Sequence, residues 1–224
     1  MTHLYEVSSD LLDQAHQGFA DLFYHLESLD LQYVRDRKYP GLSYMSRDIG
    51  YLVMPEYIES YNDDRINNLY SELYFLRPMI RYHNYPNTPG KRDGISPHVD
   101  KSSQNDPCNG IHSTALNFAI EGCDANTRSR WYRVIDAKWP DQFIYDTKDS
   151  YLGVALNSLE GVEVAEERYM ETGKTYLFRT NVFHDARAKE HTGNRRVLCC
   201  MHFTNACNWD DYTEQFRRRG WVCE

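Results

Sequence analysis

The stretch Ser96-Pro97-His98-Val99-Asp100 decides how the chain is read, because it places an imidazole and a carboxylate two positions apart. In an extended strand, residues i and i+2 point to the same side, so His98 and Asp100 are expected to share one face. A further imidazole, His184, follows 84 positions after Asp100 (184 minus 100), in Asn181-Val182-Phe183-His184. We therefore take His98, Asp100 and His184 as a candidate metal-ligand set.

The other histidines fit a ligand role less well. His184 is favoured because it falls just past the end of a predicted strand, 175–182. Apart from His98 and His184, the remaining seven lie in the N-terminal part, in β-like segments that suit a core or supporting role, or in a predicted turn: His3, His16, His25, His83, His112, His191 and His202.

The second half of the chain has the sequence pattern of a β-rich domain. Apolar alternation and turn residues predict strands over 79–85, 113–120, 129–135, 162–170, 175–182 and 196–203. Residues 101–110 are expected to form a polar loop. Residues 136–161 are expected to form a long irregular segment of the kind that often serves as a lid or binding loop.

Helices are expected before and after these strands. Apolar residues at helical spacing predict a helix over 8–29, and Pro55 opens a second helical region that breaks near 62–64. The tail, 209–219, is expected to form a short closing helix. The pattern predicts one mainly β domain, a sandwich or barrel backed by helices, with residues 1–77 as helical support, 78–208 as the β core and 209–224 as the tail.

Composition excludes several classes of function. The chain has 224 residues, enough for a well-buried core, and a net charge of -8, which makes a nucleic-acid partner unexpected. No stretch reaches the roughly 18 apolar residues of a membrane helix, and the first ten residues do not have the pattern of a secretory signal. The six cysteines lack CxxC spacing, and we expect reduced thiols in a cytoplasmic protein.

The candidate ligands suit a particular metal chemistry. Two neutral imidazoles and one carboxylate on one face of an octahedron fit Fe(II) and leave three positions open. One His-x-Asp pair is common by chance. The arrangement here is more specific, because His184 is followed after 11 and 12 positions by Arg195 and Arg196 (195 and 196 minus 184), at the start of an apolar strand.

With these features the chain resembles the Fe(II)/2-oxoglutarate-dependent oxygenase superfamily, and most closely its compact prolyl-hydroxylase-like and phage or marine-bacterial members. The resemblance covers roughly residues 78–203, and the first 77 residues carry no motif of the family. It rests on Pro97-His98-Val99-Asp100, Ala115 to Ile120, Trp131-Tyr132, Gly173 to Phe178, His184, and Arg196-Val197-Leu198 running to Phe203. It implies a double-stranded β-helix, a jelly roll of the cupin kind. It also implies Fe(II) held by His98, Asp100 and His184, and 2-oxoglutarate chelating that iron.

An arginine makes chemical sense beside such a site, because a guanidinium binds a carboxylate bidentately and 2-oxoglutarate ends in one. Arg195 and Arg196 are both candidates, and their faces are expected to be opposite. Similar family segments favour Arg196. The family often has a serine two residues later, but here the residue is Leu198. Another polar group must then assist, and the candidates are Tyr82, Asn117 and Tyr132.

The resemblance implies that O2 and 2-oxoglutarate are consumed to hydroxylate a substrate C–H bond, with release of succinate and CO2. Related halogenases lack the carboxylate ligand, so Asp100 favours hydroxylation. A small metabolite or free amino acid is the leading substrate, and a protein side chain (Pro, Asn or Asp) is the alternative. Arg128, Arg130 and Arg133 could meet an anionic substrate or be ordinary surface charges. A cupin-type metal-binding protein without 2-oxoglutarate chemistry is a further alternative.

Overall fold

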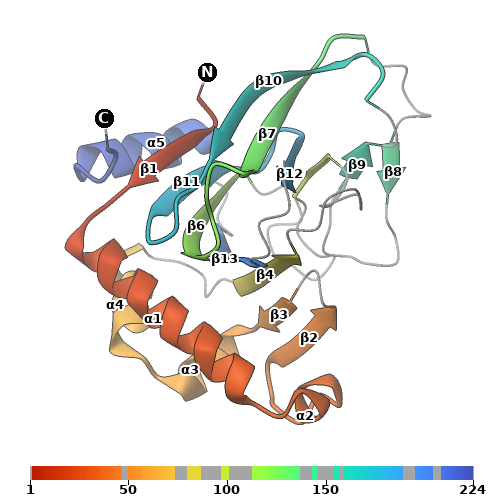
Figure 1. Cartoon of the computed structure of the whole chain (residues 1–224). Coiled ribbons are helices and arrows are strands. Elements are labelled where there is room, and N and C mark those ends of the chain that lie inside the picture. The colour runs from red at the N-terminus through yellow and green to blue at the C-terminus, as the bar shows by residue number, and fades with distance from the viewer. Residues whose placement is uncertain are drawn as a thin grey trace.

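The computed structural model of the protein describes residues 2–46, 50–73, 80–86, 97–100, 113–136, 143–145, 154–156, 159–188, 195–203 and 208–223. Figure 1 shows their arrangement as helices packed below and beside two β-sheets. In chain order the elements are β1 (Leu4–Val7), α1 (Asp10–Ser28), α2 (Leu31–Arg35), β2 (Leu42–Ser46), β3 (Gly50–Val53), α3 (Pro55–Tyr61), α4 (Asp64–Leu73), β4 (Ile80–Pro86), β5 (His98–Val99), β6 (Thr114–Glu121), β7 (Thr127–Val134), β8 (Phe143–Tyr145), β9 (Val154–Leu156), β10 (Val162–Tyr169), β11 (Thr175–Arg179), β12 (His184–Ala188), β13 (Arg195–His202) and α5 (Trp209–Arg218).

The strands form two antiparallel sheets. One has the order β1-β11-β6-β13-β4-β3-β2 and the other β10-β7-β12-β5-β9-β8. When β4, β5, β6, β7, β10, β11, β12 and β13 are numbered 1 to 8 along the chain, the central orders become 6-3-8-1 and 5-4-7-2. Successive strands thus alternate between two facing sheets, except that β7 and β10 pair within the smaller one, and this is the jelly-roll arrangement of a double-stranded β-helix. The predicted fold class is confirmed.

Five strands lie outside this central set of eight. β1 borders β11, β2 and β3 extend the larger sheet beyond β4, and β8 and β9 extend the smaller sheet beyond β5. The sequence analysis assigned no strands to the regions of β2, β3, β8 and β9. These short strands lack a long alternating pattern, and their pairing with a neighbouring edge stabilises them instead. The predicted loop 101–110 lies outside the described residues.

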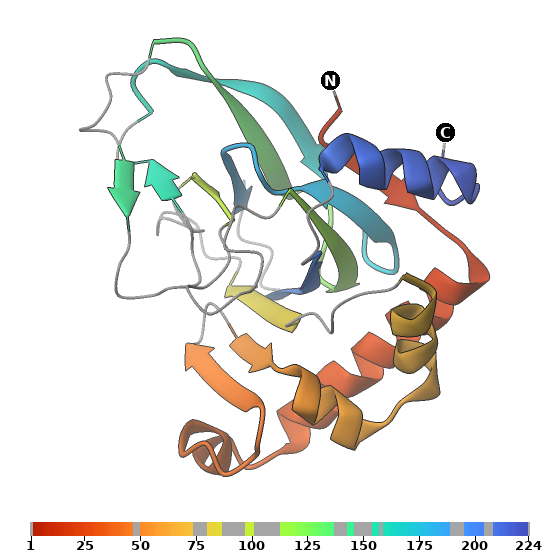
Figure 2. The ribbon, with the colours of Figure 1, turned by 180° about the vertical axis from the view of Figure 1, so that it is seen from behind.

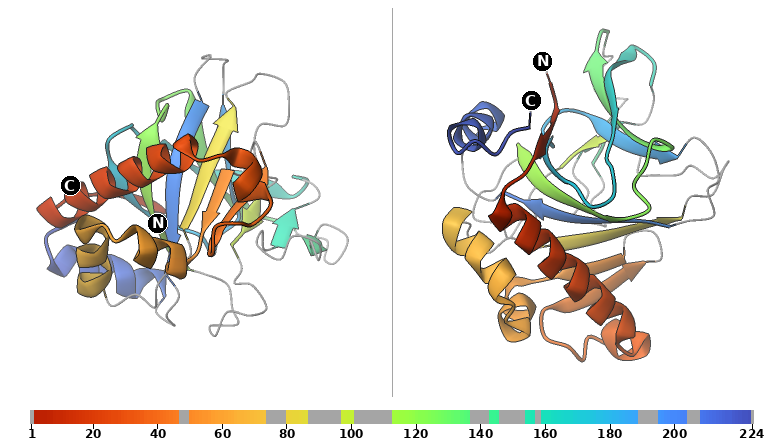
Figure 3. Two further views of the ribbon diagram at one scale, coloured as in Figure 1. Left: turned by 90° about the horizontal axis from the view of Figure 1, so that it is seen from below. Right: turned by 60° about the vertical axis from the view of Figure 1, so that its left-hand side comes forward.

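The predicted N-terminal helix is confirmed as α1. The Ser9 side chain accepts a hydrogen bond from the Leu12 backbone N–H at 3.2 Å and so caps the helix. The left-hand view of Figure 3 shows α1 crossing one face of the larger sheet. Pro55 occupies the first turn of α3, which ends at Asn62 in a left-handed conformation (φ 53°). The helix restarts at Asp64, as the sequence predicts.

The described residues form two apolar clusters, one on each side of the larger sheet. The helix-side cluster packs α1, α3 and α4 against that sheet and includes Val197, Cys199 and Met201 of β13. The interior cluster fills the space between the two sheets and consists of Leu4, Ala119, Cys123, Trp131, Met170, Tyr176, Phe178, Leu198 and Cys200. Cys199 and Cys200 thus lie on opposite faces, as expected from strand alternation.

The chain ends pack together. Val7 forms a β-bridge with Val222, and the Ser8 N–H donates to the Trp221 carbonyl at 2.8 Å. The view from behind in Figure 2 shows α5 lying alongside β1. The expected closing helix is therefore present. No helix of the described segments has the length and apolar character needed to cross a membrane.

Candidate metal centre

The smaller sheet brings the three candidate ligands together. His98 opens β5, Asp100 follows this strand, and His184 is the first residue of β12. β5 and β12 are antiparallel, and His98 stands directly opposite His184 in their register. The Asp100 N–H donates to the Thr180 carbonyl at 3.1 Å, which ties the end of β5 to the segment that precedes β12. Two distant stretches of sequence thus contribute to one point of the sheet.

The geometry fits one bound cation. All three side chains offer a ligand atom, and these atoms lie within 4.8 Å of one another. The Nε2 atom of His98 is 3.3 Å from Oδ1 of Asp100, and Nε2 of His184 is 3.8 Å from Oδ2. Ligands held about 2.1 Å from one octahedral ion lie roughly 3 Å apart, so small adjustments suffice. His98, Asp100 and His184 are 7%, 6% and 6% exposed.

The surroundings of His184 keep its imidazole neutral and oriented. Its Nδ1 lies 2.8 Å from the Val182 carbonyl, an acceptor, so Nδ1 carries the proton and Nε2 keeps its lone pair. Burial, together with the charge of His98 and against the opposing effect of Asp100, lowers the pKa of His184 to about 4. The Phe178 ring packs edge-on against His184 at 5.0 Å. A neutral imidazole whose second nitrogen is held by a carbonyl is typical of metal-binding histidines.

A buried ion pair supports the start of β12 from the other face of the sheet. Arg130 donates to both carboxylate oxygens of Asp185, from Nε at 2.9 Å and from Nη2 at 2.7 Å. The Tyr132 hydroxyl donates to Oδ2 of Asp185 at 2.8 Å. The Asp185 side chain is fully buried. Because Asp185 follows His184 directly, this cluster fixes the strand that carries the ligand.

This cluster places Tyr132 away from the interior. His184 pairs with Trp131 of the interior cluster, whereas Asp185 pairs with Arg130, and neighbouring strand residues face opposite ways. Tyr132 therefore shares the outer face with Arg130 and Asp185. The assisting role suggested for Tyr132 at the cosubstrate does not fit this position. Sequence reasoning missed Asp185, because its partners become visible only once β7 and β12 are paired.

The two adjacent arginines are separated by strand alternation. Arg195 lies on the helix side and pairs with Glu27 and Glu121. Arg196 is 1% exposed and lies on the face of β13 that carries Leu198 and Cys200. Arg196 also lies next to Cys123, which belongs to the interior cluster. Burial raises the pKa of that thiol, while the charge of Arg196 and a hydrogen bond from it act in the opposite direction.

Asn117 is a second polar residue of the interior. It lies between Leu116 and Phe118, which both face the helices, so its own side chain faces the other sheet. It is 3% exposed, and its Oδ1 atom has no hydrogen-bond partner among the residues that the structure describes. Tyr82, the remaining candidate, pairs with Tyr51 and Cys199 in the backbone register. The Tyr82 side chain lies outside the described part of the structure.

The arginines of β7 are already engaged by carboxylates. Arg128 pairs with Glu167 and Arg130 with Asp185, and Arg133 pairs with Glu163. Their suggested role toward an anionic substrate therefore gains no support from the structure. Much of the predicted binding segment 136–161 lies outside the described residues. Its strand β9 pairs with β5, where Ala155 stands opposite His98, so this segment reaches the edge of the candidate metal centre.

No family model matches the chain, and no curated protein matches it in sequence. Solved structures are similar to it at low identity. Escherichia coli YcfD is 14% identical, with a TM-score of 0.39, over 79% of this chain and 40% of that chain. The chain thus spans about two fifths of that protein. EctD from S. alaskensis is 11% identical, with a TM-score of 0.43, over 90% of this chain and 73% of the other. A Pseudomonas putida prolyl-4-hydroxylase is 15% identical, with a TM-score of 0.36, over 84% and 88%.

Proposed function

We propose that the protein is an Fe(II)- and 2-oxoglutarate-dependent dioxygenase. In this proposal it hydroxylates a C–H bond of a small metabolite or free amino acid and releases succinate and CO2. One observation carries the proposal: two imidazoles and a carboxylate lie within 4.8 Å of one another at the wall of an interior whose opposite sheet presents a buried arginine. The imidazoles and the carboxylate match the metal, and the guanidinium of Arg196 matches the distal carboxylate of the cosubstrate.

The donor set fits Fe(II). Two histidines and one carboxylate form the facial set typical of non-haem Fe(II) oxygenases, in which three further positions serve other ligands. Structural zinc sites instead use four protein ligands, commonly with cysteine. Among the described residues, the grouped ligand atoms come from His98, Asp100 and His184 without a cysteine. Three protein ligands are thus consistent with a site that binds further molecules.

The interior also fits 2-oxoglutarate. A guanidinium such as that of Arg196 binds a carboxylate with two hydrogen bonds. Buried polar atoms normally have partners, and the amide oxygen of Asn117 has none within the described part of the chain, so a further group is expected beside it. A half-turn of the amide exchanges oxygen and nitrogen, and it would direct an N–H donor toward a carboxylate. Arg196 and Asn117 are therefore the residues that we assign to the cosubstrate.

The protein residues position the reactants and exclude water. The Val182 carbonyl fixes the ring of His184, and the Arg130–Asp185 pair holds the strand behind it. Phe178 and Trp131 form an apolar wall beside His184, with ring centroids 4.7 Å apart. When bound, iron with 2-oxoglutarate supplies the activation of O2 that C–H hydroxylation requires. The chain itself contributes orientation and an environment of low dielectric constant.

The charges of the chain support the proposed substrate class. A net charge of -8 disfavours a polyanionic partner such as nucleic acid. The arginines of β7 are paired with carboxylates, so they give no basic surface for an acidic peptide. Asp100 occupies the position that related halogenases leave to a halide, which favours hydroxylation.

Succinate formation tests the proposal. Purified protein with Fe(II), ascorbate and 2-oxoglutarate is screened against free amino acids, small acids and short peptides. We expect substrate-stimulated succinate release that His184→Ala abolishes together with metal binding. Arg196→Ala should raise the required 2-oxoglutarate concentration about 100-fold, because a charged partner of the carboxylate is lost. Arg128→Ala, which breaks an exposed ion pair on β7, is the matched control. Metal binding without any affinity for 2-oxoglutarate contradicts the proposal and favours a metal-binding cupin.

A further inference from the structure

Strand β6 contains a bulge close to Arg196. In the pairing with β13, Leu198 stands opposite Ala119 but Val197 stands opposite Glu121. Ile120 is therefore an extra residue on β6. The residues that follow it point to the opposite side of the sheet from the one that regular alternation would give them. Ala119 belongs to the interior cluster and Ile120 to the helix-side cluster. Glu121, opposite the helix-side residue Val197, also lies on the helix side.

Regular alternation would have the opposite result. Asn117 and Ala119 both face the interior, so an unbroken strand would direct Glu121 to the interior as well. There its carboxylate would lie beside Arg196, because an unbroken pairing that has Leu198 opposite Ala119 would place Arg196 opposite Glu121. A protein carboxylate at that position would compete with a ligand carboxylate for the same guanidinium. The bulge prevents this by directing Glu121 through the sheet to the other face.

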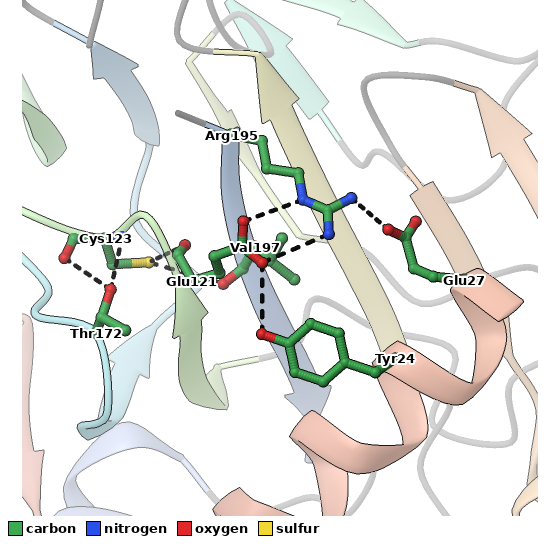
Figure 4. Close-up of polar contacts among 7 residues, drawn as sticks. All are labelled: Tyr24, Glu27, Glu121, Cys123, Thr172, Arg195 and Val197. Carbon is green, nitrogen blue, oxygen red and sulfur yellow. Dashed lines mark hydrogen bonds and ion pairs between the residues drawn. The ribbon is translucent and has the colours of Figure 1, made fainter. Parts of the chain in front are cut away.

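On the helix side Glu121 has its own cationic partner. Arg195 donates to Glu121 from Nε at 3.2 Å and from Nη2 at 3.4 Å. Arg195 also pairs with Glu27 of α1, and its guanidinium lies 5.1 Å from the centre of the Phe23 ring. The Tyr24 hydroxyl reaches Glu121 at 3.5 Å. Figure 4 shows Arg195 between Glu121 and Glu27, with the Tyr24 hydroxyl directed at Glu121.

The chain after the bulge is fixed by close contacts. Gly122 has a positive φ of +63°, and a Cβ atom there would come within 1.9 Å of the Arg195 carbonyl oxygen. Only glycine fits so close to the first residue of β13. Cys123 then returns to the interior. Its backbone is held by Thr172, whose Oγ1 accepts from the Cys123 N–H at 2.9 Å and donates to the Cys123 carbonyl at 3.1 Å (Figure 4).

We propose that the bulge at Ile120 and the Arg195–Glu121 ion pair form an electrostatic partition between the two faces of the sheet. Arg195 neutralises Glu121 on the helix side, and the charge of Arg196 acts on the carboxylate of the ligand in the interior. This inference rests on the proposed function, because the ligand is the 2-oxo acid assigned there. Arg195 is then a residue that tunes cosubstrate affinity without touching the cosubstrate.

Substitutions on the two sides of the ion pair distinguish this role from mechanical support. Arg195→Gln leaves the Glu121 charge without its main partner behind Arg196. Two like charges about 10 Å apart, at an effective dielectric constant near 20, repel each other enough to weaken binding roughly tenfold. Because Glu121 is partly exposed, solvent screens its repulsion of the ligand carboxylate, and we expect 2-oxoglutarate to bind about fivefold more weakly. Glu121→Gln removes the repelling charge, so affinity should stay the same or rise. The double variant should bind within about twofold of the wild type.

A purely supporting role predicts a different pattern. Breaking one contact from either side would then weaken binding in Arg195→Gln, in Glu121→Gln and in the double variant alike. Arg65→Gln is the control for lost charge. Arg65 also pairs with two carboxylates, Asp21 and Asp63, and its side chain is 34% exposed, against 32% for Arg195.

The measurement is calorimetric titration of 2-oxoglutarate into protein loaded with Mn(II), without O2, so that no turnover occurs. Weaker binding by Arg195→Gln that Glu121→Gln restores supports the partition. Equal weakening in all three variants, or unchanged affinity in Arg195→Gln, overturns the partition while the proposed function stands. Absence of 2-oxoglutarate binding to the wild type overturns both.

Discussion

Replacement of Arg130 by glutamine tests the buried ion pair behind the candidate metal centre. Arg130 binds both oxygens of Asp185, whose side chain is fully buried, while the Arg130 side chain is 19% exposed. Glutamine removes the positive charge and leaves the buried Asp185 carboxylate without a cationic partner. Loss of one partner of a buried ion pair typically costs about 3–5 kcal/mol.

The expected loss is near the lower limit of that range, because the partial exposure of Arg130 lets water solvate the remaining charge to some extent. We expect the free energy of unfolding to fall by about 3 kcal/mol. For a chain of this size each kcal/mol corresponds to roughly 2–4 °C in melting temperature, so the midpoint should fall by about 6–12 °C. Metal affinity should fall as well, because Asp185 directly follows His184 at the start of β12.

The assay is urea unfolding at pH 7 with a chelator present, followed by circular dichroism. Arg128→Gln is the matched control, two residues earlier on β7, where both partners of the ion pair are 33% exposed. It should lose no more than about 1 kcal/mol. In an Asp185→Asn background, Arg130→Gln should also cost no more than about 1 kcal/mol, because the buried charge is absent. Similar small losses for Arg130→Gln and Arg128→Gln would refute the reasoning.

Three further predictions concern stability and metal binding. Gly122→Ala should lower the free energy of unfolding, measured in urea, by about 2–4 kcal/mol. Gly173 also has a positive φ, but a Cβ atom there would meet nothing within 4 Å, so Gly173→Ala should cost only about 1 kcal/mol. Equal losses would contradict the close contact at Gly122. Because the pKa of buried His184 is about 4, the unfolded chain binds a proton below pH 6.5 that the folded chain does not. Metal-free protein should thus lose roughly 2 kcal/mol between pH 7.5 and pH 5, and His184→Gln should remove this part of the slope. Phe178→Ala removes a ring that contacts both His184 and Trp131, and it should cost about 3–4 kcal/mol and weaken Mn(II) binding measured by calorimetry.

The sequence predicted the features that depend on local pattern. The His-x-Asp spacing places two ligands on one short segment, and helical spacing predicts α1 from its apolar residues. The succession of helices and short strands predicted a helix-backed β-sandwich or barrel, the resemblance implied a double-stranded β-helix, and this fold class is confirmed. The proximity of His184 to His98 and Asp100 is present in the structure. The roles of these residues in binding iron, and of Arg196 in binding the cosubstrate, stay predictions.

Features that depend on strand pairing could not be predicted. The strand expected over 175–182 ends at Arg179, and His184 opens a separate strand, because the chain leaves one sheet for the other between them. The outward position of Tyr132 follows from the register of β7 with β12, which no single strand reveals. The facing of Glu121 depends on a bulge whose signal in the sequence is only a glycine after the strand.

The most direct test of the central claim is an anaerobic titration of metal-free protein with Fe(II) and then with 2-oxoglutarate. Chelation of iron by a 2-oxo acid gives a weak visible charge-transfer band. We expect this band to appear with the wild type and to be lost in His98→Ala, while Arg128→Ala, which alters an ion pair on β7, keeps it. Absence of the band at saturating iron and 2-oxoglutarate would contradict the claim that His98, Asp100, His184 and Arg196 form a 2-oxoglutarate-dependent iron site.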